Sequence, residues 1–240
     1  MAQQFNYMGR FISILLLFVS ALAFGQSNMM VLSTPASEES VTYREGFAYF
    51  FENNTDNEVG TAWTNTGPLT FSTTPTTIPE GTYCAYDNST SGDYITIIDF
   101  TFSATGFSVA FWFYTDAEDT NARIFGNGNF EVKFATLGND IDIIEDDNTV
   151  EFNNVGTIIG QWNHYVIVYD KTTPSCKVYF NGSETSIDAG SVDGGSTLTG
   201  TWYFLHDATG YIDDARGYDE KITSDDVTAI YTYPGVLLEN

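Results

Sequence analysis

Basic side chains are scarce in this chain, and their scarcity narrows the choice of partners. Only 8 lysines and arginines stand against 32 aspartates and glutamates, which gives a net charge of −24 at pH 7. Such a field repels phosphate backbones and anionic lipid surfaces, so we expect no nucleic acid partner. Neutral glycans, proteins and divalent cations remain, and the acid excess by itself also serves solubility.

Cysteine is nearly absent as well. Cys84 and Cys176 are the only two, and neither lies near a histidine or another cysteine at the spacing of metal ligands. An oxidising compartment permits a disulfide between them, whereas the alternative is two buried thiols on separate strands. The sequence leaves both alternatives open.

Long apolar runs are missing except near the amino terminus. Arg10 precedes the apolar run 11–24, which is shorter than the roughly 20 residues that span a bilayer. This layout is typical of a cleavable secretory signal, here residues 1–25, and the alternative is an uncleaved membrane anchor. We therefore expect a secreted or cell-surface protein with no membrane insertion after cleavage, a lead-in segment at 26–40 and one domain at 41–240.

Helical periodicity is almost absent, whereas short β-type runs broken by Gly, Asn and Asp are frequent. Residues 107–114 (FSVAFWFY) and 165–169 (YVIVY) are dense aromatic and β-branched runs, and Asn181-Gly182 is a strong hairpin signal. Thr223 and Asp226 are placed to cap a short helix near the carboxyl end. The pattern predicts an all-β fold of two packed antiparallel sheets with a short C-terminal helix.

Four motifs in order resemble a known family. They are Phe107-Ser108-Val109-Ala110-Phe111-Trp112-Phe113, Gly160-Gln161-Trp162-Asn163-His164, Val178-Tyr179-Phe180-Asn181-Gly182, and Gly210-Tyr211-Ile212-Asp213-Asp214-Ala215-Arg216-Gly217-Tyr218. The succession resembles the laminin-G-like domains of the concanavalin A-like lectin and glucanase superfamily. This resemblance implies a two-sheet jelly-roll sandwich. It also implies the roles found in that family, which include glycan binding, adhesion and accessory domains of enzymes.

The resemblance further implies a calcium site. Family members often hold calcium near the closing strand, together with an acidic loop after the first strand. Here these positions correspond to Asp213 and to Asp56 and Glu58 in the loop 52–58. Calcium takes six to eight oxygen ligands, which this loop and Asp213 can supply. The alternative is a solvated acidic loop without a metal.

Several motif residues have simpler structural roles. Trp112, Trp162 and Tyr169 lie on β-type runs, and we expect them in the core. His164 is expected to be a hydrogen-bonded structural histidine. Adjacent residues on a strand point to opposite faces, so Asp213 and Asp214 cannot form a carboxylate pair. Instead, Asp214 is expected to form an ion pair with the residue two positions on, Arg216.

Aromatic residues in loops are the candidates for stacking on a sugar ring. Trp63, Trp202 and Tyr203 fit this requirement, with His206 and Asp207 as polar neighbours. The alternative for each aromatic residue is packing beneath a loop.

A hydrolase is the rival hypothesis, because glucanases of this fold hold carboxylates close together on one strand face. The best match is Glu145 with Glu151, six residues apart across the turn-like 146–148, and this spacing does not fit. We therefore expect no enzyme. The sequence favours a secreted, calcium-associated module that recognises glycans or extracellular proteins. The alternatives are a structural or adhesive surface protein without a small ligand and, less favoured, a glycoside hydrolase.

Overall fold

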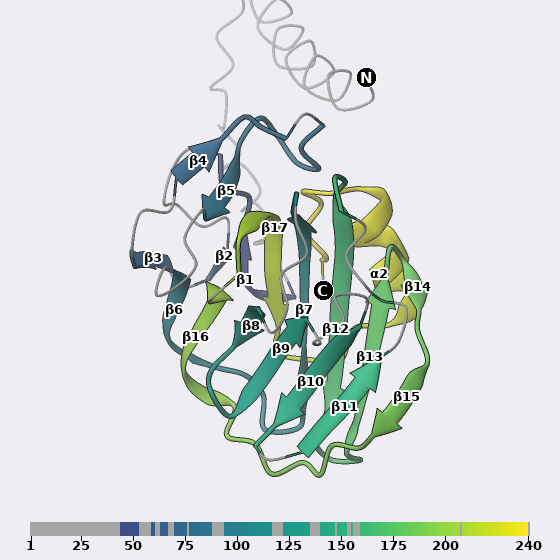
Figure 1. Cartoon of the computed structure of the whole chain (residues 1–240). Coiled ribbons are helices and arrows are strands. Elements are labelled where there is room, and N and C mark those ends of the chain that lie inside the picture. The colour runs from purple at the N-terminus through teal and green to yellow at the C-terminus, as the bar shows by residue number, and fades with distance from the viewer. Residues whose placement is uncertain are drawn as a thin grey trace, which may run out of the picture. The chain divides into compact units, whose positions relative to one another are not determined.

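Figure 1 shows the computed structural model of the chain. The structure describes residues 44–52, 59–60, 63–66, 70–75, 77–87, 94–116, 122–134, 140–146, 148–152, 155, 159–206 and 208–239. At positions 59, 63–66, 97–99 and 188–189 it describes the backbone alone. The predicted signal peptide and lead-in segment lie outside the described residues, as do Asp56, Glu58 and Asp207.

Two antiparallel sheets contain all the described strands. The nine-stranded sheet has the order β14 (Ser183–Glu184), β13 (Ser175–Phe180), β12 (Asn163–Asp170), β7 (Gly106–Tyr114), β17 (Gly210–Tyr218), β1 (Glu45–Tyr49) and β2 (Val59–Gly60), with β5 (Cys84–Asp87) pairing with β17 and β4 (Thr70–Ser72) pairing with β5. Strands distant in the sequence, such as β1, β7 and β17, are neighbours in it. This connectivity, together with an eight-stranded second sheet, confirms the predicted jelly-roll sandwich.

The eight-stranded sheet is built mostly from the middle of the chain. Its order is β15 (Ile187–Gly190), β11 (Asn148–Phe152), β10 (Ile141–Glu145), β9 (Phe130–Phe134), β8 (Arg123–Gly126), β16 (Thr199–His206), β6 (Tyr94–Thr101) and β3 (Trp63–Thr66). β8 to β11 follow one another as a meander of hairpins, seen in teal and green in Figure 1.

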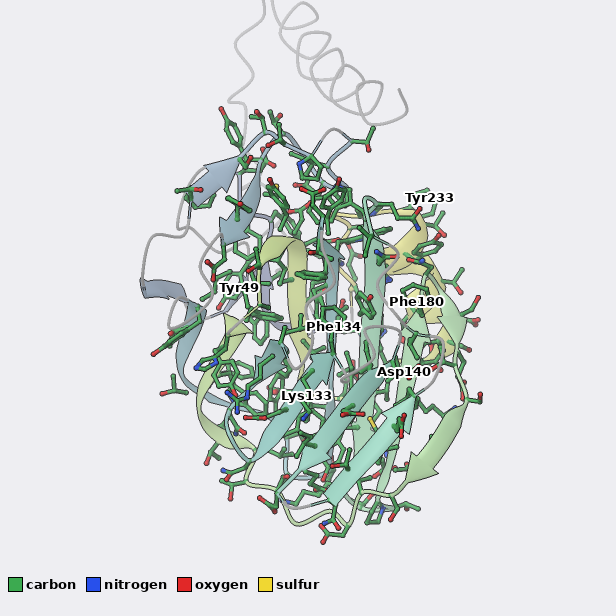
Figure 2. The ribbon with its side chains drawn as sticks, in the orientation of Figure 1. Tyr49, Lys133, Phe134, Asp140, Phe180 and Tyr233 are labelled. Atoms are coloured by element: carbon green, nitrogen blue, oxygen red, sulfur yellow. The ribbon has the colours of Figure 1, made fainter. Side chains whose placement is uncertain are left out.

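The core lies between the two sheets and is rich in aromatic rings. Tyr49 from the nine-stranded sheet and Phe134 from the eight-stranded sheet are both labelled in Figure 2, and both are buried. Along β7, Phe107, Phe111 and the other odd-numbered residues belong to this core, because successive side chains on a strand point to opposite faces. The even-numbered residues of β7 therefore point away from the core, toward the outer face of the nine-stranded sheet.

The predicted C-terminal helix is α2 (Ser224–Thr232), and it packs on that outer face. Thr223 and Asp226 form the expected capping box, because each side chain accepts a hydrogen bond from the other residue's backbone N–H. Val227 and Ile230 are buried in a second, smaller hydrophobic cluster with residues of β7, β12 and β17. α2 therefore covers part of the sheet and leaves the rest of its outer face for other segments.

A tight turn joins β13 to β14, as predicted. Asn181 and Gly182 have φ angles of 49° and 79°, a left-handed pair that suits this two-residue hairpin. A Cβ at Gly182 would lie 2.7 Å from the ring of Tyr231, so glycine is also required by the close approach of α2. The turn thereby holds Asn181 next to the helix.

The predicted ion pair on the closing strand is confirmed. Arg216 donates from Nε to Asp214 Oδ1 at 2.6 Å and from Nη2 to Oδ2 at 2.8 Å, and both side chains are buried. Glu45 Oε1 lies 3.8 Å from Arg216. Arg216 Nη1 also donates to the carbonyl of Val236, and this contact ties the C-terminal segment to the sheet. Removing one partner would leave a buried charge uncompensated.

The two cysteines are buried free thiols, so the disulfide alternative is wrong. Cys84 lies on β5 and Cys176 on β13, and β17, β7 and β12 separate these strands within one sheet. Four strand spacings amount to about 19 Å, far beyond the Cα separation of a disulfide. Burial raises the pKa of Cys84 to about 12, which makes it a poor nucleophile.

None of the helices in the described part of the chain has both the length and the apolar character needed to cross a lipid bilayer.

Candidate functional site

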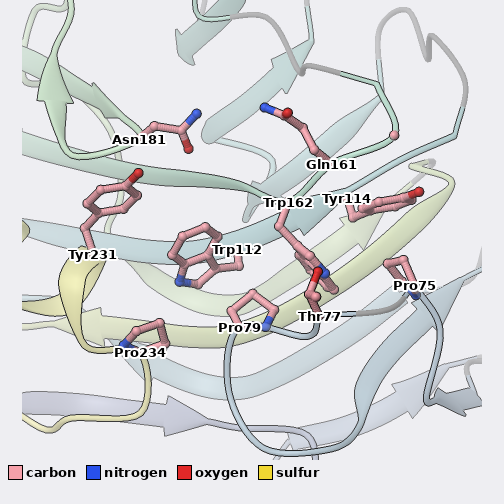
Figure 3. Close-up of a pocket in the computed structure, with 11 residues that line it drawn as sticks. Pro75, Thr77, Pro79, Trp112, Tyr114, Gln161, Trp162, Asn181, Tyr231 and Pro234 are labelled. Atoms are coloured by element: carbon pink, nitrogen blue, oxygen red, sulfur yellow. The ribbon is translucent and has the colours of Figure 1, made fainter.

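A pocket of about 520 Å³ opens on the outer face of the nine-stranded sheet (Figure 3). The loop between β4 and β5 forms one side, and the C-terminal end of α2 forms another. Strand β7 and the residues before β12 form the floor. The pocket is lined by Pro75, Thr77, Pro79, Trp112, Tyr114, Gly160, Gln161, Trp162, Asn181, Tyr231 and Pro234.

Four aromatic rings dominate the lining. Trp112 stacks on Tyr231 with ring centroids 5.6 Å apart, and Tyr114 lies 5.8 Å from Trp162. All four side chains are partly buried. The four rings lie around the pocket, as Figure 3 shows, so a ligand entering it would meet aromatic side chains.

The prediction that Trp112 and Trp162 belong to the core is wrong. Both are partly buried and line the pocket, whereas Tyr169 is fully buried in the core as predicted. Trp112 points outward because the register of β7 commits Phe111 and Phe113 to the core. Every residue of 109–114 is apolar or aromatic, so the sequence carries no polar alternation that would have revealed the outer face. The regular spacing from Phe107 to Phe113 was the only available signal.

Polar groups in the pocket are amides, indoles and hydroxyls rather than charges. No charged side chain is among the described lining residues, although the chain carries 32 acids. Asn181 Oδ1 accepts a hydrogen bond from His164 N at 2.8 Å, and this bond fixes the orientation of the amide. The Nε1 atoms of Trp112 and Trp162 are buried and have no hydrogen-bond partner within the described structure. Unpaired donors of this kind cost free energy until something accepts from them.

His164 lies directly beneath the aromatic lining. Its ring centroid is 4.9 Å from that of Trp112 and 5.6 Å from that of Tyr231. Burial, assisted by the nearby positive charge of Arg216, lowers the pKa of His164 to about 3, so the ring is neutral at physiological pH. A neutral, fully enclosed ring supports the two aromatic side chains. This placement agrees with the expected structural role, although Nδ1 is buried without a partner among the described residues, so the expected hydrogen bond is not found at that atom.

The predicted sugar-binding residues do not come together at this pocket. Trp202 is fully buried, stacks on Phe125 at 5.0 Å and donates from Nε1 to the carbonyl of Phe100 at 3.2 Å. It is a core residue, so its assignment to a ligand site is wrong. The structure places Trp63 on β3, where only the backbone is described, and Asp207 lies outside the described residues.

Tyr203 and His206 do lie together, on the outer face of the eight-stranded sheet. Their ring centroids are 4.7 Å apart, and Tyr94 of β6 lies 5.1 Å from His206. The hydroxyl of Tyr203 donates to Glu131 Oε1 at 3.0 Å, and Glu131 also pairs with Arg123. We call Tyr94, Tyr203 and His206 the second aromatic cluster.

Asp213 meets one requirement of the predicted cation site. It is fully buried, Oδ2 accepts from Glu80 N at 2.9 Å, and Oδ1 has no partner among the described residues. Burial and the neighbouring Asp214 raise the pKa of Asp213 well above its usual range. The described residues contain no group of three His, Cys, Asp or Glu side chains placed to hold a metal. The residues present therefore fit a cation in part, through Asp213 Oδ1.

The carboxylates of the hydrolase hypothesis lie on opposite faces of the eight-stranded sheet. Glu145 is buried and accepts from the backbone N–H groups of Asp193 at 2.7 Å and Ser196 at 3.1 Å, and from the hydroxyl of Tyr169. These bonds hold the loop between β15 and β16. Glu151 lies opposite Asp142 in the register of β10 and β11, so their side chains share a face. Asp142 and Glu145 point to opposite faces of β10, so Glu151 faces away from Glu145. The two glutamates cannot flank one glycosidic bond.

Comparison with solved structures shows likeness in fold. Domain 4 of an extracellular GH43 arabinanase from Geobacillus stearothermophilus, in complex with arabinotriose, is 19% identical with a TM-score of 0.60, covering 79% of this chain and 98% of that domain. The binding domain of botulinum neurotoxin serotype D in complex with N-acetylneuraminic acid is 15% identical with a TM-score of 0.59, covering 80% of this chain. That of botulinum neurotoxin DC, in complex with rat synaptotagmin II, is 11% identical with a TM-score of 0.59, covering 79%.

The chain spans about half the length of these toxin domains, 52% and 51% respectively. A search of curated proteins found no relative in sequence. The sequence profile of the concanavalin A-like lectin/glucanases superfamily matches residues 88–228. This range includes β7 and the residues before β12, which form the pocket floor. Because the match covers more than half of the chain, the chain belongs to the concanavalin A-like lectin/glucanase superfamily.

Proposed function

We propose that this chain is a secreted carbohydrate-binding module and that the pocket on the nine-stranded sheet is its site. The observation that carries the proposal is the lining itself, four aromatic rings with amide groups and no charged side chain among the described residues. A sugar ring offers C–H groups that pack on aromatic faces and hydroxyls that pair with amides.

The electrostatics favour neutral sugars. The net charge of −24 opposes the approach of sulfated, phosphorylated or carboxylated glycans, and the lining contains no cation to offset that field. A neutral pyranose or furanose loses little hydration free energy on entering the pocket, because its hydroxyls exchange hydrogen bonds to water for hydrogen bonds to the amides. The fold is compatible with this proposal, since the arabinanase domain described above was solved with arabinotriose.

We propose binding without catalysis. Glu145 is committed to the loop between β15 and β16, and Glu151 faces away from it. The pocket lining likewise offers no carboxylate to serve as nucleophile or general acid among its described residues. Export through the predicted signal 1–25 would place the module where polysaccharides occur.

A bound calcium ion is a separate proposal, supported by Asp213. A buried carboxylate oxygen without a hydrogen-bond partner is the kind of ligand that calcium takes, and the backbone N–H of Glu80 orients the other oxygen. Asp56 and Glu58 would complete the site. If calcium binds the folded state alone, chelation lowers the melting temperature, and Asp213→Asn abolishes that difference.

A glycan array tests the function. The secreted protein should bind neutral glycans, and Trp162→Ala should remove the signal while Tyr203→Ala, in the second aromatic cluster, keeps it. Repeating the array with chelator separates calcium-dependent from calcium-independent recognition. No binding to any glycan would favour a scaffold or a protein ligand, and loss of binding in Tyr203→Ala alone would move the site to the other sheet.

A further inference from the structure

A row of aromatic side chains extends from the pocket across the outer face of the nine-stranded sheet. Tyr86 of β5 lies opposite Tyr211 of β17, and Tyr211 lies opposite Tyr114 of β7. Trp162 directly precedes β12, whose first residue pairs with Phe113 of β7. Four neighbouring segments therefore present one aromatic ring each at the same level of the sheet. We call Tyr86, Tyr211, Tyr114 and Trp162 the aromatic row.

The rings of the row form a continuous series of contacts. The centroids of Tyr86 and Tyr211 are 4.3 Å apart, those of Tyr211 and Tyr114 are 5.6 Å apart, and those of Tyr114 and Trp162 are 5.8 Å apart. Three strand spacings give a row about 14 Å long. Because Tyr114 and Trp162 also line the pocket, the row is a continuation of the site.

The row is accessible and points away from the core. All four side chains are partly buried, whereas their sequence neighbours Ala85, Ile212 and Phe113 belong to the core between the sheets. Tyr114 meets Tyr211 edge to face at an interplanar angle of 82°, and Tyr86 and Tyr211 stack at 22°, so these contacts use part of the ring faces and leave the outward sides of the rings for a ligand. Tyrosine and tryptophan rings combine a large apolar surface with a polar tip, and this combination is enriched at binding surfaces.

The row, unlike the pocket lining, is bordered by a charged side chain. The hydroxyl of Tyr114 donates to Asp116 Oδ1 at 2.9 Å, and the hydroxyl of Tyr211 hydrogen-bonds with Thr74. An exposed aspartate and hydroxyl groups border the rings. A negative charge here opposes acidic sugars and tolerates neutral ones.

We propose that the pocket and the aromatic row together bind an extended, neutral polysaccharide chain, with one sugar unit in the pocket and further units over Tyr114, Tyr211 and Tyr86. This inference rests on the proposed carbohydrate-binding function. The spacing of the rings is comparable with the length of one sugar unit in an extended chain. The row crosses the strands on a sheet face, so a peptide could not use it by adding a strand, because strand addition requires a sheet edge.

A length series of oligosaccharides tests the proposal. Calorimetry with the secreted protein uses cello-, xylo-, manno- and arabino-oligosaccharides from one to six units. Each added unit that reaches a further ring should strengthen binding, with a total gain of about tenfold or more between the shortest and longest ligands that bind. Equal affinity for short and long members of every series would overturn the extended-chain proposal and leave the function intact.

Variants locate the additional units. Tyr86→Ala should weaken binding of the longest oligosaccharide by about threefold to tenfold and leave a disaccharide unchanged. Trp162→Ala should weaken both, because it lines the pocket itself. Tyr94→Ala, a partly buried tyrosine on the other sheet, is the matched control and should change neither. Equal effects of Tyr86→Ala on short and long ligands, or an effect of Tyr94→Ala alone, would contradict the row. No binding of any oligosaccharide would overturn the function as well.

Discussion

The outer faces of the two sheets carry similar aromatic side chains in different surroundings. In the pocket, Trp112 and Trp162 have indole N–H groups without partners among the described residues, and the lining is uncharged. In the second aromatic cluster, the hydroxyl of Tyr203 already donates to Glu131, beside the Glu131–Arg123 ion pair. The difference teaches that aromatic content alone does not identify a binding site. What matters is whether the polar tips of the rings are satisfied within the protein.

The largest expected effect separates a core tryptophan from a pocket tryptophan. Trp202→Ala should reduce the free energy of unfolding by about 3–5 kcal/mol, because the ring is fully enclosed and its N–H is paired. Trp162→Ala, at a partly exposed ring, should cost about 1 kcal/mol. Denaturant titration measures both. Similar losses in the two variants would mean that the pocket tryptophan is structural.

Affinity should show the reverse order. Trp112→Ala and Trp162→Ala should each weaken binding of a neutral oligosaccharide by tenfold to a hundredfold, about 1.4–2.8 kcal/mol, because aromatic residues in pockets often dominate binding energy. Tyr203→Ala should change the affinity by less than about twofold. Fluorescence titration suits this measurement, since Trp112 and Trp162 report on the pocket. A larger effect at Tyr203 would reverse the comparison between the two faces.

The buried histidine beneath the pocket, His164, sharpens the comparison through pH. Above pH 6.5 His164 is neutral in both the folded and the unfolded chain. As the pH falls below 6.5, the unfolded chain takes up a proton that the folded chain, with a pKa of about 3, refuses. Between pH 6.5 and about 3, His164 therefore lowers stability by up to about 1.4 kcal/mol for each pH unit, and below the folded pKa the decline stops.

Thermal unfolding from pH 7 to pH 4 measures this effect. His164→Phe should flatten the decline in melting temperature, because the variant lacks the group that the folded chain keeps unprotonated. An identical decline in wild-type and His164→Phe would show that other groups control the acid sensitivity.

The smallest effect concerns salt. Binding of a neutral oligosaccharide in an uncharged pocket should change by less than about twofold when the ionic strength rises from 0.05 to 0.5 M, since salt screens only charge interactions. Dissociation constants at the two ionic strengths measure this. A strong dependence would indicate a charged ligand and would direct attention to the Arg123–Glu131 pair beside the second aromatic cluster.

Much of the fold could be predicted from local patterns. The strands 107–114 and 165–169, the turn at Asn181-Gly182 and the capping box of Thr223 and Asp226 were all identified because each depends on residues close in the sequence. The ion pair of Asp214 with Arg216 was predicted for the same reason. The residues of the candidate site were harder to predict from the sequence. Of the five residues proposed for sugar recognition, Trp202 lies in the core, whereas Tyr203 and His206 lie together on the other sheet, away from the pocket.

The sequence by itself determined the class of structure, because β-propensity, turn residues and capping act over a few residues, and four ordered motifs indicated the superfamily. It also determined the acidic field that disfavours anionic ligands. Only the tertiary structure decided which tryptophans are buried and which are available. That outcome depends on the register between β7, β12 and β17 and on where α2 and the β4–β5 loop cover the outer face. The run 109–114 has no polar residue to mark its outer face, so the pocket became evident only in the assembled sheet.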